Sequence, residues 1–280
     1  MKKFTLKSLS FVLAIVLLVS CLAFVGCNDD DEEYKNDPAS AMKLINKAED
    51  QLETYRMTIK LWQFESEDEL QSNIEAGKYS TMSVQEFDKN NFFLHAPDTM
   101  DFDYVVCDNM VYVVGERIDN GFGMFLPSAN GNIIAVNGME KYAFTDDEYD
   151  AVMASLIGIK MKIEKDHLKT VTITKLDDGK IKLSVTEMSD KYFEDTTYSD
   201  EVTILKSTFE IIFDSNGRYL KGINRYDYRI KYEYFDGQET VKVDQTYYTY
   251  SETAYEYNNI KITAPENANE YELVDVDWNN

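Results

Sequence analysis

The segment 225–234 constrains the fold more than any other, because two kinds of side chain alternate along it without a break. One set is aromatic or aliphatic, and the other is charged. The first set is Tyr226, Tyr228, Ile230, Tyr232 and Tyr234, and the second is Arg225, Asp227, Arg229, Lys231 and Glu233. Successive side chains of a strand point to opposite faces, so this pattern predicts a strand with an aromatic interior face and a charged solvent face. Strands with one solvated face are typical of antiparallel sheets.

Strand-like runs separated by turn residues fill most of the rest of the chain. The expected strands are 57–64, 79–87, 91–96, 102–107, 111–116, 171–174, 181–185, 209–213, 241–250 and 254–262. Three turn sequences are typical of hairpin connections: Asp108-Asn109, Asp177-Asp178-Gly179 and Asp214-Ser215-Asn216-Gly217. The sequence therefore predicts a long antiparallel meander.

Two helices are expected beside these strands. Asp37 before Pro38 is a good N-cap, and an apolar stripe at helical spacing predicts a helix over 38–54. Thr145 and Glu148 form a capping-box pattern that predicts a second helix over 146–157. Its bulky side consists of Tyr149, Val152, Met153 and Leu156. The opposite side is small, which suits either the border of a cavity or close packing against a neighbouring element.

The first 27 residues have the pattern of an export signal. Three lysines precede an uncharged apolar run, 8–26, and Cys27 follows it. The sequence Ala23-Phe24-Val25-Gly26-Cys27 resembles the lipobox of bacterial lipoproteins, which implies a signal peptide over 1–26 and a lipidated Cys27. Cys21 also fits the lipobox, but Cys27 is followed at once by an acidic stretch that water solvates readily. An uncleaved membrane anchor is the third reading, since about 18 apolar residues can just span a bilayer.

The domain organisation follows from this signal. Residues 27–37 are expected to form a lipidated, acidic tether, and 38–280 a single domain. The formal net charge is −23, and loss of the three signal lysines would make it about −26. Such an acidic excess disfavours nucleic acid and anionic lipid headgroups, so the acyl chains are the expected hold on the membrane. The expected location is the extracytoplasmic face of the cell membrane, whichever of the three readings holds.

The chain carries no motif for catalysis, a metal or a cofactor, and none of these is predicted. The two histidines, His95 and His167, are far apart in the sequence, and neither has a nucleophile motif around it. Cys107 is the one thiol outside the signal, and it lies in a strand-like run that is typical of a buried, inert cysteine.

Aromatic residues supply the candidate ligand contacts. Ten tyrosines lie between Tyr219 and Tyr257, and an aromatic face that includes Tyr228 and Tyr232 can stack on sugars or line an apolar groove. Cross-strand tyrosine pairs that only stabilise the sheet explain the same composition. The loop 119–127 contains two glycines and several large apolar residues, among them Phe122 and Phe125. It is suited to be a lid, although a buried strand with a glycine bulge fits it better.

The order of these elements resembles that of LolA-like and LppX-like lipoproteins. The resemblance rests on the lipobox, a helix leading into Tyr55-Arg56-Met57-Thr58, the meander, the mid-chain helix and an ending over 257–268 with Pro265-Glu266-Asn267-Ala268. It implies an α+β fold with a strongly curved antiparallel sheet, a half-barrel, and both helices on its concave face. It also implies non-catalytic binding of a hydrophobic or amphipathic ligand, for lipid sensing or transfer. The alternative is an envelope interaction module that binds a protein or wall polymer through its sheet; the oligomeric state stays open.

Overall fold

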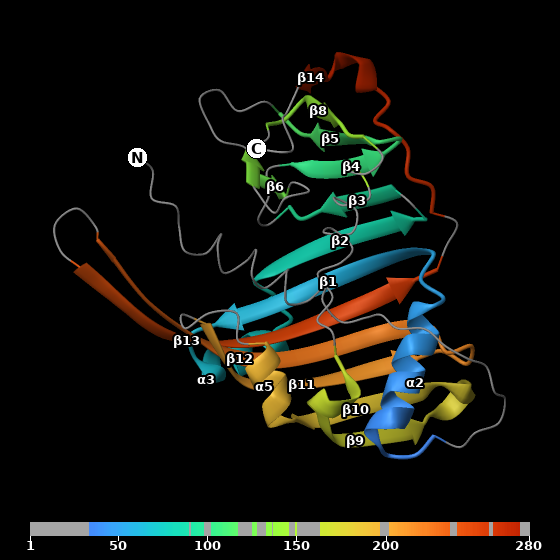
Figure 1. Ribbon diagram of the computed structural model, residues 1–280, viewed down its shortest axis with the longest axis vertical. Coiled ribbons are helices and arrows are strands. Elements are labelled where there is room, and N and C mark those ends of the chain that lie inside the picture. The colour runs from blue at the N-terminus through green and yellow to red at the C-terminus, as the bar shows by residue number, and fades with distance from the viewer. Residues whose placement is uncertain are drawn as a thin grey trace.

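The chain is a sheet-dominated α+β protein. Its structure is a computed structural model that describes residues 34–89, 91–97, 102–116, 125–127, 133–135, 137–145, 149, 163–196, 202–235, 240–257 and 260–274. Twelve strands form one mixed sheet that is not closed, and helices lie against it (Figure 1). A separate pair, β6 (Phe125–Pro127) and β7 (Ile133–Ala135), forms a two-stranded sheet.

The strand order places the first strand beside the last but one at the centre of the large sheet. From one edge to the other the order is β14 (Glu272–Val274), β8 (Glu140–Ala143), β5 (Met110–Val114), β4 (Asp103–Cys107), β3 (Asn91–His95), β2 (Thr81–Asp88), β1 (Thr54–Phe64), β13 (Thr240–Glu256), β12 (Tyr219–Phe235), β11 (Val202–Phe213), β10 (Ile181–Met188) and β9 (Leu168–Lys175). β1 therefore pairs with β13, although most of the chain separates them.

The expectation of a fully antiparallel sheet is wrong at one edge, where β14 pairs with β8 in parallel. The segment between β13 and β14 explains this. It packs across the sheet, where Ile262 and Tyr271 join Val105, Cys107 and Tyr112 in one buried cluster. Because this crossing segment replaces a hairpin, the last strand reaches the edge in the same direction as its neighbour.

Helix α2 (Pro38–Glu49) starts as predicted and ends earlier. Asp37 is the N-cap, and its Oδ1 accepts a hydrogen bond from the Ser40 N–H at 2.8 Å. The predicted end at residue 54 is wrong, because β1 already begins at Thr54, where it pairs with Asp88 of β2. The residues between the two elements, 50–53, form a turn that directs the chain from the helix into the strand.

The structure contains two short helices that the sequence analysis does not predict. α3 (Glu67–Glu75) begins after Ser66, whose Oγ accepts from the Glu69 N–H, and α5 (Asp190–Asp195) begins after Ser189 in the same way. Three 3-10 turns complete the elements of the described residues: η1 (Lys165–His167), η2 (Asp177–Gly179) and η3 (Ala268–Glu270). The expected helix over 146–157 lies outside the described residues except for Tyr149, which is helical.

The large sheet has two faces, which we name after the helices that cover them. Figure 1 shows α2 and α5 on the near side of the sheet, the α2 face, and α3 on the far side, the α3 face. The α2 face carries two apolar clusters. The α2 cluster joins α2 to β9–β12 and includes Leu44, Leu183, Phe213 and Tyr228; the β4 cluster covers β1–β5 and β8 and includes Met57, Phe92, Val111 and Tyr142.

The alternation along β12 is confirmed in its interior face. Tyr226, Tyr228 and Ile230 are buried on the α2 face, whereas Lys231 is exposed. The expectation that Asp227 faces solvent is wrong, since its side chain is buried. The reason is that α3 covers this part of the other face, where its Glu67 forms an ion pair with Arg225 beside Asp227.

β12 and β13 continue beyond their neighbours as a hairpin arm. β11 pairs with β12 as far as Ile230, and β1 pairs with β13 as far as Tyr248. Beyond these positions, 231–235 and 240–247 pair with each other, and the arm extends to the left of the sheet in Figure 1. The predicted strands 241–250 and 254–262 are thus one strand, which ends at Glu256.

Candidate ligand-binding site

The structure places some of the predicted contact residues, and it does not bring them into one site. Cys21, Cys27, Phe122, Val152, Met153 and Leu156 lie outside the described residues. Phe125 begins β6 and pairs with Ala135 of β7. Tyr149 is buried in the β4 cluster, with its ring centroid 6.4 Å from that of Phe144. Tyr228 and Tyr232 belong instead to the α2 cluster, where the first is buried and the second half-buried.

A group of polar side chains that sequence reasoning missed lies on the α2 face between the two apolar clusters. The register aligns Ser207 of β11 with Tyr226 of β12, Tyr226 with Thr249 of β13, and Thr249 with Gln63 of β1. The next row of the sheet adds Ser251 of β13 and Thr81 of β2, which lie on either side of the apolar Leu61 of β1. We call these six residues the polar band.

The oxygens of the polar band lack partners to an unusual degree. In the described part of the chain, no hydrogen bond reaches Gln63 Oε1, Thr81 Oγ1, Tyr226 Oη, Thr249 Oγ1 or Ser251 Oγ, and all five atoms are buried. Thr249 and Ser251 have no exposed surface at all. Buried polar atoms without a partner are rare in proteins and cost about 1–3 kcal/mol each. These five are a third of the 15 buried polar side-chain atoms without a hydrogen bond in the described residues, and their nearness to one another on one face marks the band as the candidate site.

Helix α5 closes one end of the polar band. The Ser207 hydroxyl donates to Tyr192 Oη of α5 at 3.3 Å. Burial raises the pKa of Tyr226 well above its ordinary value, and the nearby Tyr228 and Tyr192 hydroxyls raise it further. The Thr249 hydroxyl lowers it in part, although Tyr226 and Thr249 do not reach hydrogen-bond geometry. Tyr226 is therefore a neutral phenol at physiological pH, able to donate one hydrogen bond and accept others.

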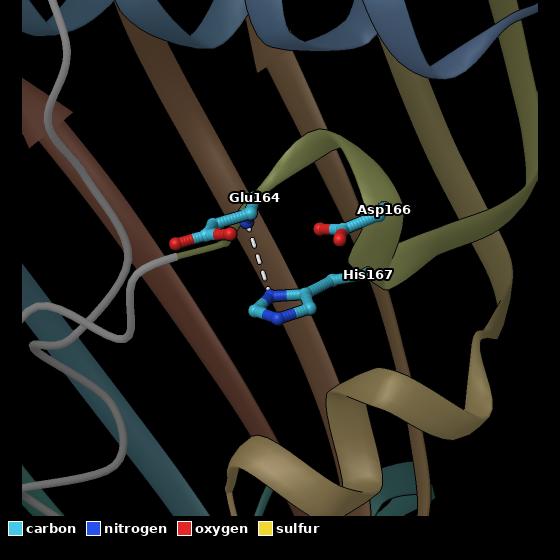
Figure 2. Close-up of side chains that lie close together, drawn as sticks. All are labelled: Glu164, Asp166 and His167. Atoms are coloured by element: carbon cyan, nitrogen blue, oxygen red, sulfur yellow. Dashed lines mark hydrogen bonds between the residues drawn. The ribbon is translucent and has the colours of Figure 1, made fainter.

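A histidine holds α5 in place. Figure 2 shows Glu164, Asp166 and His167 close together, and its dashed line is the bond from the Glu164 N–H to His167 Nδ1, which measures 3.0 Å. His167 Nε2 lies 2.9 Å from Asp195 Oδ2 at the end of α5. Since Nδ1 accepts, the ring proton is on Nε2 and donates to Asp195. The ring also packs edge-on against Tyr192, with centroids 5.8 Å apart.

The same three side chains have the composition of a metal site. One potential ligand atom from each of Glu164, Asp166 and His167 lies within 4.8 Å of the others. However, the protein already uses both ring nitrogens of His167, and the two carboxylates are exposed. A metal ion would have to break one of these bonds, so the geometry fits a clamp between η1 and α5 better than a metal centre.

The other residues considered for chemistry lie apart from the polar band. His95 Nδ1 lies 2.6 Å from Asp103 Oδ1, on strands β3 and β4. Cys107 is buried against the crossing C-terminal segment, and burial together with Asp108 raises the pKa of its thiol to about 11. The thiol is therefore protonated at neutral pH, which confirms the prediction of a buried cysteine.

Comparison with known proteins adds no relationship. No family model matches the sequence, and no protein of curated function matches it significantly. In the described part of the chain, no helix is both long and apolar enough to cross a membrane.

Proposed function

We propose that this chain is a lipid-anchored extracytoplasmic protein that binds an amphipathic ligand on the α2 face and carries out no catalysis. In this proposal Cys27 carries the acyl chains, and the sheet curves around its ligand as a half-barrel of the LolA-like kind. The observation that carries the proposal is the polar band, because its buried oxygens lack partners while apolar clusters flank it on both sides. A ligand with an apolar body and a hydrogen-bonding group would match both features.

Helix α5 provides a route to the site. It contains six residues, and Tyr192 is its contact with the polar band. His167 and the Ser189 cap hold it to η1, so its displacement would uncover Ser207 and Tyr226 without breaking the pairing of any strand. Short elements with few hydrogen bonds are those that open most readily.

The test compares two matched deletions of a tyrosine hydroxyl. Tyr226→Phe removes an oxygen of the polar band, whereas Tyr250→Phe removes one on the α3 face of the adjacent strand, where it donates to Glu252 at 2.8 Å. Full chain isolated in nonionic detergent is extracted with organic solvent, and the co-purified ligand is measured by mass spectrometry. One lost hydrogen bond should reduce occupancy about two- to ten-fold in the first variant and leave it unchanged in the second. Wild-type protein that neither carries nor takes up any lipid would refute the proposal.

A second candidate function, an envelope interaction module, is favoured by the hairpin arm. Its strands have no further neighbours in the described part of the chain, and half-buried Tyr232, Val241 and Val243 share one side of it. An arm with open edges can add a strand from a partner protein. Replacing Val241 and Val243 by serine would then abolish partner binding and leave lipid occupancy unchanged.

A further inference from the structure

The sheet separates its charges by face. On the central strands β1, β2, β12 and β13, every charged side chain of the described part lies on the α3 face, including Arg56, Lys60, Glu86, Arg225, Asp227 and Glu252. The α2-face positions of these four strands hold apolar, hydroxyl and amide side chains and no Lys, Arg, His, Asp or Glu. This separation occurs in a chain whose composition includes 28 basic and 51 acidic residues.

The basic residue of α5, the helix that contacts the polar band, already forms ion pairs with other side chains. Lys191 pairs with Asp195 of the same helix and with Asp166 of η1. The hydroxyl of Tyr226, the one tyrosine of the polar band, is neutral. A phosphate or carboxylate bound at the polar band would therefore meet no counter-charge on these strands, and a buried, unpaired ion costs several kcal/mol. An ammonium group would likewise meet no carboxylate on these strands, and the nearby Glu65, which follows β1 and adds to the effect of burial in raising the pKa of Tyr247, is exposed to solvent.

The unpartnered atoms define what the ligand must supply. Gln63 Oε1 is an acceptor, and the hydroxyls of Thr81, Tyr226, Thr249 and Ser251 can each donate and accept. From the charge separation and these atoms, we infer that the polar band recognises the uncharged, hydroxyl- and carbonyl-bearing head of a neutral lipid, an acylglycerol or a glycosylated acylglycerol. This inference rests on the proposed function, because it names the ligand class of that same site.

The experiment compares heads that differ in charge on identical acyl chains. Full-length protein in nonionic detergent is equilibrated with equimolar dioleoylglycerol, monoglycosyl-dioleoylglycerol, dioleoyl phosphatidic acid and dioleoyl phosphatidylglycerol, and the lipid retained after gel filtration is measured by mass spectrometry. We expect at least ten-fold more neutral than anionic lipid. The ratio between the two neutral lipids tells whether the head is glycerol alone or a sugar, and either result supports the inference.

Variants connect this preference to the polar band. Combining Thr249→Val with Ser251→Ala removes two hydroxyls with little change of shape, and it should reduce the neutral-to-anionic ratio at least three-fold. Thr58→Val is the matched control, since Thr58 is half-buried on the opposite face of adjacent β1. Anionic lipids retained as well as neutral ones would overturn the inference and leave lipid binding standing. Retention of none of the four lipids would overturn the proposed function together with it.

Discussion

Thr249→Val should make the ligand-free protein more stable, which is the opposite of what most core substitutions do. Thr249 has no exposed surface, and its Oγ1 has no hydrogen-bond partner in the described part of the chain. Valine keeps the branched shape and replaces this hydroxyl with a methyl group. A buried hydroxyl without a hydrogen bond destabilises the folded state by about 1–3 kcal/mol, and its removal should recover part of this free energy. We therefore expect the free energy of unfolding to rise by about 1 kcal/mol.

The assay is thermal or urea unfolding of delipidated protein, with Thr58→Val as the matched control. For a chain of this size, about 1 kcal/mol corresponds to a rise of about 2–4 °C in Tm. The control should lie within about 0.5 kcal/mol of wild type, because Thr58 is half-buried on the other face of the sheet. Adding bound lipid should reverse the order, because the wild type gains a hydrogen bond that the variant cannot form.

A loss of about 1 kcal/mol or more in delipidated Thr249→Val would refute this reasoning, since it would mean that the protein itself satisfies the hydroxyl. Tyr226→Phe offers an independent check, because Tyr226 Oη is also buried without a partner in the described residues. The two hydroxyls are close enough to influence each other, so the double variant should be measured as well. A coupling energy above about 0.5 kcal/mol would show a direct bond between them.

Three further predictions concern the fold and the anchor. Ile230→Ala should cost about 2–5 kcal/mol in chemical unfolding, because Ile230 is buried in the α2 cluster, whereas exposed Lys231→Ala should change stability by less than about 0.5 kcal/mol. Asp227→Asn should raise the free energy of unfolding at pH 7, because burial raises the pKa of Asp227 above its ordinary 3.8 despite the opposing attraction of Arg225 and Lys206; the gain should disappear in unfolding curves below that pH, where both states hold the proton. Cys27→Ala should release the protein from membranes or leave an unprocessed precursor, and retained lipid labelling in that variant, with loss in Cys21→Ala, would assign the anchor to Cys21.

The strands could be predicted from the sequence where one face is apolar and the other charged. The alternation around Ile230 fixes which side chains of β12 are interior, and Asp108-Asn109 forms the expected tight turn with positive φ at both residues, 54° and 57°. Of the two helices that the sequence analysis missed, α3 carried a usable signal, because Ser66 is followed by Glu69 in a capping-box pattern, whereas α5 has Tyr192 at the corresponding position. Their apolar stripes are too short for periodicity to reveal.

The polar band could not be predicted, because its existence depends on register. Along β13, tyrosines occupy both faces: Tyr247 shares the α2 face with Thr249, and Tyr250 lies on the other. The charged residues of β13, such as Lys242, Asp244 and Glu252, share the parity opposite to Thr249, but the run 245–251 between them holds no charge, and threonine and serine in a strand are normally read as its solvated side. Pairing with Tyr226 decides the orientation, and that pairing is a long-range property.

The register of the central strands puts their charged side chains on one face of the sheet and the buried hydroxyls on the other, and this arrangement bears on the proposed ligand. A sheet that needed only a core could fill the centre of its α2 face with apolar residues, as the two flanking clusters do. It holds instead uncharged polar atoms that the described chain leaves unbonded, while all the charges of its four central strands lie on the other face. Natural proteins leave few buried polar atoms without a hydrogen bond. Where they do leave some, a functional site is the expected place. A neutral, hydrogen-bonding ligand would satisfy these atoms and would add no buried charge, which is why the stability of Thr249→Val with and without lipid tests both the site and its chemistry.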